Sequence, residues 1–101
     1  MSVLIDDKLN LNGLTVVKFF AEWCMPCKKL DSLLLKMEKE FPEVNFVSVD
    51  IDQHLKLAQE YRIMSVPTLL FFVGDKEVNR VQGLVMTEQL RKTFKAFTGK
   101  K

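Results

Sequence analysis

The sequence predicts an α/β domain in which helices cover both faces of a mixed β-sheet. A nearly continuous run of apolar and β-branched residues from position 14 to position 20 is typical of a strand buried on both faces. Strand-like and helix-like spacings then alternate along the rest of the chain. A length of 101 residues suits one domain, and we expect residues 1–101 to form it.

Around the buried strand, the first half of the chain predicts four further elements. We expect a short edge strand over residues 3–5 and a brief helical turn over residues 8–11, capped by Asp6 or Asp7. From residue 26 to residue 41, apolar side chains recur at steps of three and four, which predicts an amphipathic helix. Pro26 suits its first turn and Pro42 ends it. Alternation over residues 44–49 predicts the next strand.

The second half of the chain predicts two helices and a β-hairpin. Residues 50–52 lead into a helix, and residues 68–73 and 77–82 read as hairpin strands around a turn. Gly83 interrupts this ladder, and a last helix starts near Thr87 and ends at Gly99. We expect the following helical residues to face inward: Leu55, Ala58, Tyr61, Leu90, Phe94 and Phe97.

Composition and charge exclude several classes of function. A net charge of +2 is too small to suggest nucleic-acid binding, and 48% apolar with 28% charged residues is ordinary for a globular protein. The amino terminus shows no secretory signal, and the longest apolar run, residues 69–73, is too short to cross a bilayer. We therefore expect a cytoplasmic monomer with no nucleic-acid or membrane partner.

The two cysteines of the chain, Cys24 and Cys27, are the strongest chemical signal. Two thiols at this spacing close a small disulfide ring or bind a metal as a pair. A helix beginning just after Cys24 directs its free N–H groups and positive end at that sulfur, which stabilises an exposed thiolate there. Cys27, one turn deeper, is partly covered. This asymmetry suits disulfide exchange, in which the exposed thiolate attacks and the covered thiol resolves.

Two simpler interpretations of the cysteines were weighed. A structural zinc needs four ligands, and His54 is the only other strong soft ligand, at a helix start where a solvated histidine is expected. Two unconnected core cysteines would not explain Trp23 in front of the pair or Pro26 inside it. We therefore predict no metal.

Two separate motifs resemble the thioredoxin family. Residues 20–28, FAEWCMPCK, resemble its active site, which usually has Gly where Met25 stands. Residues 61–69, YRIMSVPTL, are similar to its second signature, in which a cis-proline, here Pro67, lies opposite the dithiol. The element order also matches from about Leu14 to Phe97. The resemblance implies a thioredoxin fold with a shortened amino-terminal βα segment.

The resemblance also implies an activity. It makes the chain a thiol–disulfide oxidoreductase that reduces protein disulfides, with Cys24 as the nucleophile and Cys27 as the resolving thiol. Pro26 in place of His resembles the reducing members of the family. An NADPH-dependent thioredoxin reductase would regenerate the dithiol, so the chain itself would bind no cofactor. The implied substrate groove consists of Trp23, Met25, Val66, Pro67 and Gly83.

Two other functions stay open beside this one. The first alternative is a thioredoxin-like protein that serves a single partner or is more oxidising than the reducing members of the family. The second is a non-catalytic binding subunit that uses the same fold. Lys18 and Met25 support the first alternative, and there are further departures from the family pattern. Lys18 stands where the family usually buries an aspartate, and Ser48 stands where the lysine that partners it is common. Ser32 replaces the proline that kinks the long helix.

Lys18 is unexpected, because a lysine in a strand buried on both faces is costly unless it reaches water or is neutral. The shortened amino terminus opens this position to water, or a charged Lys18 lowers the pKa of the resolving thiol, or a neutral Lys18 accepts its proton. Our hypothesis is the second, which makes the protein a weaker reductant than a relative with an aspartate. Glu22 is a candidate partner because positions four apart share one face of a strand. Pro26 and Pro67 are expected to tune the site as well.

Overall fold

The computed structural model describes residues 4–5, 8–9 and 11–99 of the chain. The elements are β1 (Leu4–Ile5), β2 (Lys8–Leu9), β3 (Leu14–Phe20), α1 (Met25–Glu40), β4 (Asn45–Asp50), α2 (Leu55–Glu60), β5 (Thr68–Val73), β6 (Lys76–Gln82) and α3 (Thr87–Thr98). Four strands form one sheet in the order β4-β3-β5-β6. β3 runs parallel to β4 and antiparallel to β5, and β5 pairs antiparallel with β6. The predicted mixed sheet is confirmed.

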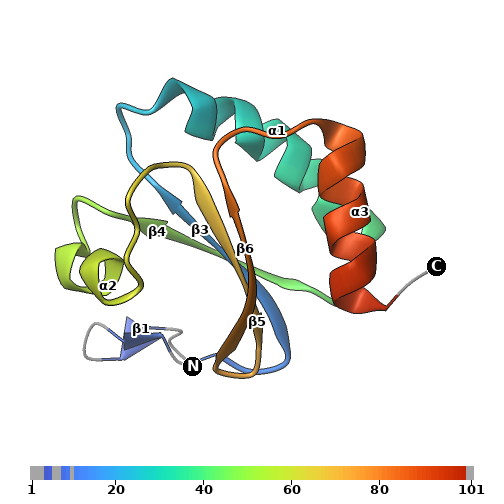
Figure 1. Ribbon diagram of the computed structural model, residues 1–101, viewed down its shortest axis with the longest axis horizontal. Helices are drawn as coiled ribbons and strands as arrows, with labels where there is room; N and C mark the ends of the chain where they lie inside the picture. The colour runs from blue at the N-terminus through green and yellow to red at the C-terminus, as the bar shows by residue number, and fades with distance from the viewer. Residues whose placement is uncertain (1–3, 6–7, 10, 100–101) are drawn as a thin grey trace.

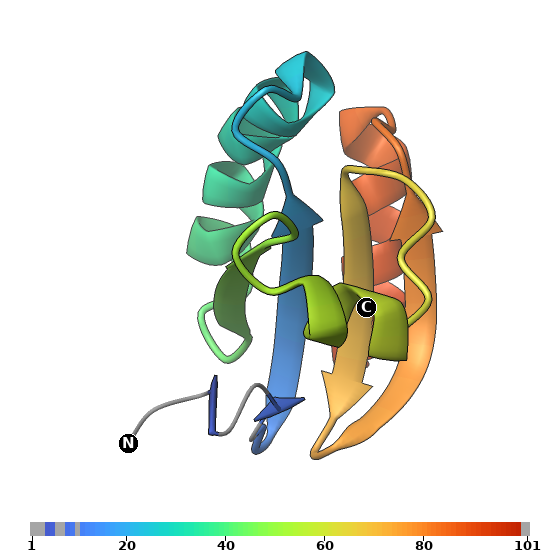
Figure 2. The same cartoon turned by 90° about the vertical axis from the view of Figure 1, so that its left-hand side faces the viewer.

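Helices cover both faces of the sheet, with α1 and α3 on one face and α2 on the other (Figure 1 and Figure 2). Successive side chains of β3 point to opposite faces, as in any strand. Val16 therefore packs in the core beneath α1 and α3, whereas Val17 and Phe19 pack in the core beneath α2. The apolar run that predicted a strand buried on both faces is explained by these two cores.

The amphipathic spacing of helix α1 places Cys27 in the core. Its buried residues recur at steps of three and four, so they lie on the face that covers the sheet. They are Cys27, Leu30, Leu34 and Met37. Cys27 is the first of them, so the packing that anchors α1 also fixes the second cysteine at the sheet. Within the described ranges, no helix combines the length and hydropathy needed to span a bilayer.

Two expectations about local structure were wrong. Lys8–Leu9 is a strand, β2, that pairs with β1, where a helical turn was expected. The cross-strand pairing satisfies backbone groups that a single short turn would leave open, and the expected caps Asp6 and Asp7 lie outside the described residues. Leu55 is 61% exposed, because the six-residue helix α2 instead buries Leu57 and Ala58.

Candidate redox site

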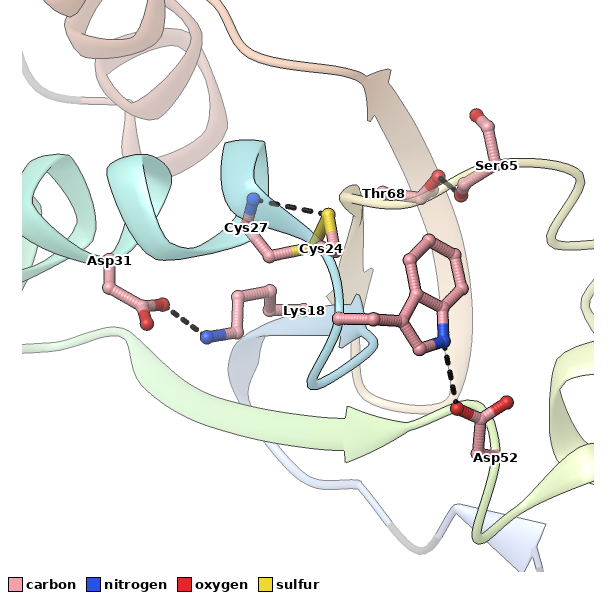
Figure 3. The surroundings of a disulfide bond; sticks show 8 residues. Lys18, Cys24, Cys27, Asp31, Asp52, Ser65 and Thr68 are labelled. Atoms are coloured by element: carbon pink, nitrogen blue, oxygen red, sulfur yellow. Dashed lines mark hydrogen bonds and ion pairs between the residues drawn. A yellow bond between two sulfur atoms is a disulfide. The ribbon is translucent and has the colours of Figure 1, made fainter.

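The Cys24–Cys27 disulfide lies where the chain leaves β3 and enters α1 (Figure 3). Cys24 is the N-cap of α1, and its Sγ accepts a hydrogen bond from the backbone N–H of Cys27 at 3.2 Å. The two Cα atoms are 5.4 Å apart, within the range of disulfides. The pair therefore forms the small ring predicted from its spacing. Among the described residues, no group of three or more His, Cys, Asp or Glu side chains is arranged to hold a metal ion.

Both cysteines are buried in the disulfide form. Cys24 is 4% exposed and Cys27 is 2% exposed, so the expectation of an exposed Cys24 is wrong for this state. The reason is packing: both cluster with Ala21, and Phe20 and Val66 pack against them. The asymmetry between them is instead one of helix position, since Cys24 sits at the cap and Cys27 inside the first turn.

The start of α1 favours negative charge at Cys24. The first turn contains no acidic residue, so nothing there opposes the positive end of the helix dipole. The Cys27 N–H that points at Cys24 Sγ adds a fixed donor. On reduction, these groups stabilise a thiolate at Cys24, the form in which a cysteine is a nucleophile.

The loop before β5 lies beside the disulfide. The Val66–Pro67 peptide bond is cis, and Val66 packs against the cysteine cluster. The Gly83 N–H donates to the Pro67 carbonyl at 2.8 Å, which joins the end of β6 to this loop. Thr68 Oγ1 donates to the Ser65 carbonyl at 2.7 Å and secures the same loop (Figure 3). The structure thus places Val66 against the disulfide and joins Gly83 to the neighbouring Pro67.

Trp23 and Met25 lie next to the cysteines along the chain and are 68% and 63% exposed. The Trp23 indole N–H donates to Asp52 Oδ2 at 3.1 Å. The Asp52 N–H in turn donates to Asp50 Oδ1 at 2.9 Å. The sequence analysis did not single out Asp52. Its signal was topological, since Phe20 and Asp50 pair at the ends of parallel strands and the segments that follow them lie close together.

Comparison with known proteins agrees with this geometry. The family model for thioredoxin matches residues 5–96 of the chain. This chain belongs to the thioredoxin family. It is similar to a thioredoxin of Chlamydia trachomatis, with 43% identity over 81 residues that cover 80% of this chain and 79% of that relative.

Solved thioredoxin structures share the fold. The Fasciola hepatica thioredoxin superposes with a TM-score of 0.75 at 39% identity, covering 91% of this chain and 85% of that one. A structure on the thiol resolving mechanism in yeast mitochondrial 1-Cys peroxiredoxin via glutathione/thioredoxin systems has a TM-score of 0.79 at 28% identity, covering 86% and 81%. The thioredoxin fold expected from the two motifs is confirmed. Family membership and the disulfide together identify the chain as a thiol–disulfide oxidoreductase, and the thioredoxin family acts on disulfide substrates.

Lys18, one of the departures from the thioredoxin pattern, has an ion-pair partner in the structure. Lys18 is 9% exposed, pairs in the sheet with Ser48 and Leu69, and forms an ion pair with Asp31 of α1. Its Nζ also lies 4.8 Å from the ring centroid of Phe20, close enough for a cation–π contact.

The observed ion pair corrects the expectation that Glu22 partners Lys18. The sequence analysis did not single out Asp31. The available signal was its position four residues after Cys27, one turn along the same face of the predicted helix. Lys18 pairs with Asp31 and not with Glu22 because α1 packs over the face of β3 that carries Lys18. Glu22 lies in the connection beyond the strand.

Two cavities border Lys18 in the part of the chain that the structure describes. A cavity of about 300 Å³ is lined by Lys18, Cys27, Asp31, Ser48 and neighbouring residues. A second cavity of about 340 Å³ also borders Lys18, Asp31 and Ser48. Ser48 has a short side chain and leaves room at this position. Both cavities are lined by β3, α1 and β4, so these elements leave space beside Lys18.

Proposed function

We propose that this protein reduces disulfide bonds in other proteins, with Cys24 as the attacking nucleophile and Cys27 as the resolving thiol. One observation carries the assignment of roles. Cys24 Sγ sits at the N-cap of α1 and accepts the Cys27 N–H, so the cap residue has the stabilised thiolate. Cys27 lies inside the first turn of α1 and its sulfur is bonded to Cys24, so we assign it the attack on Cys24 that closes the disulfide.

The reaction has two exchange steps. The Cys24 thiolate attacks one sulfur of the substrate disulfide, and the second substrate sulfur leaves as a thiolate. The Cys27 thiol then loses its proton and attacks Cys24 Sγ, which closes the Cys24–Cys27 disulfide and releases the other substrate sulfur. Two electrons pass to the substrate, and the protein ends in the disulfide form seen in the structure.

The substrate groove of this proposal runs past Val66, Pro67 and Gly83. An extended substrate segment would pair with the backbone beside Pro67 as an added strand. Trp23 and Met25 would supply the exposed apolar wall on the other side of the disulfide. The hydrogen bond between Gly83 and the Pro67 carbonyl supports this proposal, because it fixes the relative position of two of the groove segments.

The same proposal sets the partners and the setting. An NADPH-dependent thioredoxin reductase would return electrons to the Cys24–Cys27 disulfide, so the chain would act as a monomeric cytoplasmic electron carrier that binds no cofactor. Disulfides formed on thiol peroxidases are candidate substrates, which the likeness to the peroxiredoxin-related structure supports.

A second candidate function is a relative dedicated to one partner or to oxidation. Lys18 at the buried position and Met25 at the rim of the disulfide favour it, because both change side chains next to the reacting sulfurs. Coupling to a thioredoxin reductase and NADPH separates the two, since the general reductant accepts electrons efficiently and the dedicated relative does not.

The experiment is turnover of a disulfide-bonded protein such as insulin with dithiothreitol as the electron source. The wild-type chain should accelerate reduction, and Cys24→Ser should fall to the uncatalysed rate. Ser32→Ala, an exposed change on the same helix, is the matched control and should keep full activity. Turnover that survives Cys24→Ser would overturn the assignment of Cys24 as the nucleophile. A wild-type chain that does not accelerate reduction would overturn the proposal and favour a binding subunit in which the dithiol is incidental.

A further inference from the structure

The cavity beside Cys27 holds an unusual set of charges. Its lining includes Lys18 from β3, Glu22 from the following connection, and Lys28 and Asp31 from α1, whereas Ser48 from β4 adds no charge. Of the four charged side chains, Lys18 alone belongs to the buried residues, and Glu22, Lys28 and Asp31 are exposed. Water screens exposed charges more than buried ones. Lys18 is therefore the least screened of the four charges that line the cavity with Cys27.

Asp31 modifies this effect through its ion pair. It lies four residues after Cys27, so its side chain projects from the same face of α1. Its carboxylate contacts Lys18 Nζ, which reaches it from β3 beneath the helix (Figure 3). The Lys18 side chain is 11% exposed and the Asp31 side chain is 51% exposed. The positive partner is thus in the drier position, and the negative partner is partly hydrated.

We propose that, in the reduced protein, the Lys18 ammonium stabilises the Cys27 thiolate and the Asp31 carboxylate limits that stabilisation. This inference rests on the proposed role of Cys27 as the resolving thiol. A nearby positive charge favours the thiolate and a nearby negative charge opposes it, most strongly where water is scarce. The pair thereby sets how readily Cys27 loses its proton before it attacks the mixed disulfide.

The two charges must then act in opposite directions, which separates this proposal from a purely structural role. Removing Lys18 takes away a stabilising charge and raises the pKa of Cys27. Removing the negative charge of Asp31 leaves Lys18 unopposed and lowers that pKa. A pair that only holds α1 against the sheet would shift the pKa of Cys27 in one common direction or leave it unchanged in both variants.

The test uses the Cys24→Ser chain, in which Cys27 is the sole thiol and its ionisation is followed by the ultraviolet absorbance of the thiolate. Lys18→Met should raise the titration midpoint by about one pH unit, and Asp31→Asn should lower it by roughly half a unit. The smaller shift for Asp31→Asn follows from the greater hydration of that side chain. The two shifts partly cancel in the double variant, whose midpoint should lie about half a unit above the parent value.

Two matched controls carry the same changes of charge far from the cavity. Lys39→Met in the last turn of α1 and Asp75→Asn between β5 and β6 should leave the midpoint unchanged. Lys18→Gln serves as a second neutral variant with the same expected direction, should Lys18→Met fail to fold. Shifts of the same sign, or no shift in either single variant, overturn the proposal.

This titration is independent of substrate turnover. The insulin assay on the wild-type chain decides whether the protein reduces disulfides, and the titration decides what sets the proton affinity of Cys27. A chain that reduces insulin but shows no opposite shifts contradicts only the electrostatic proposal. A chain that shows the shifts without reducing insulin contradicts only the proposed function.

Discussion

The two flanks of the Cys24–Cys27 disulfide differ in almost every physical respect. The groove flank, which we propose as the substrate groove, consists of the uncharged residues Trp23, Met25, Val66, Pro67 and Gly83, and its Trp23 and Met25 side chains are exposed. The cavity flank, formed by Lys18, Asp31 and Ser48, contains an ion pair between a buried lysine and a half-exposed aspartate, and both side chains line the same cavity as Cys27. We infer that the two flanks have separate roles. The groove flank determines which substrate chain binds, and the cavity flank sets the pKa of Cys27.

The largest expected effect comes from removing the sulfur of Cys27, which resolves the mixed disulfide. Cys27→Ser should leave the mixed disulfide between Cys24 and a protein substrate intact at least about 1,000-fold longer, because intramolecular attack far outpaces attack by free thiols. Non-reducing gel electrophoresis after mixing with insulin would show the adduct. Cys24→Ser is the control that should form none. An adduct that fails to accumulate with Cys27→Ser would show that the roles of the cysteines are misassigned.

Changing the groove flank should affect binding without affecting ionisation. Trp23→Ala should lower kcat/KM for a protein disulfide about tenfold, mainly through KM, because an exposed aromatic side chain is a typical anchor for a partner. The pKa of Cys27 should stay unchanged. Val78→Ala, which removes another exposed apolar side chain, one that lies beside α3, should leave kcat/KM unchanged. A Trp23→Ala chain with altered Cys27 ionisation would break the division between the flanks.

The two partners of the ion pair in the cavity flank should contribute unequally to the free energy of unfolding. Asp31→Asn leaves the Lys18 ammonium 11% exposed without its carboxylate and should lower the free energy of unfolding by about 1–2 kcal/mol. We reduce the usual cost of breaking a buried pair because Asp31 is half exposed. Lys18→Met leaves only a hydrated carboxylate and should change stability by less than about 1 kcal/mol. Urea unfolding of the disulfide forms measures both. Equal losses would show that Lys18 is not the costly partner.

The smallest effect is expected far from both flanks, where Arg91 of α3 pairs with Glu40 at the end of α1. The hydrogen bond from Arg91 holds the pKa of Glu40 below its usual value. This contribution to stability is therefore present above the unfolded pKa of a glutamate, near 4.3, and is lost as the pH falls through the lower folded value. Glu40→Gln should slightly reduce stability at neutral pH and flatten its acid dependence.

Thermal unfolding as a function of pH checks this prediction. Glu38→Gln, an exposed carboxylate on the same helix, is the matched control and should keep the acid dependence of the parent. Neither change should alter the pKa of Cys27. A stability profile that Glu40→Gln leaves identical to the parent would contradict the contribution assigned to the Arg91 pair.

The central sheet and the long helices could be predicted because each repeats one pattern over many residues. The apolar run of β3 and the three-and-four spacing of α1 each reflect burial that the structure confirms. The predictions for the short elements were wrong because these elements are too short to repeat a pattern. With two residues, β2 offers no period to read, and in the six-residue helix α2 the choice between Leu55 and Leu57 as the buried residue depends on packing against the sheet.

The site was predictable as far as local motifs extend. Cys24, Cys27 and Pro67 belong to contiguous signatures, and the structure places the loop of Pro67 beside the dithiol. The partners of Trp23 and Lys18 were not found, because Asp52 is 29 residues and Asp31 is 13 residues away along the chain. Only the packing of α1 over β3 and the parallel pairing of β3 with β4 bring these carboxylates to the site.

The most direct test of the account is the reduction potential of the Cys24–Cys27 couple, measured by equilibration with glutathione. A protein disulfide reductase in which Lys18 favours the thiolate should lie between the value typical of thioredoxins, about −270 mV, and about −220 mV. Lys18→Met should move the potential toward the more negative end. A wild-type potential near that of disulfide-forming oxidants, about −120 mV, would contradict the account.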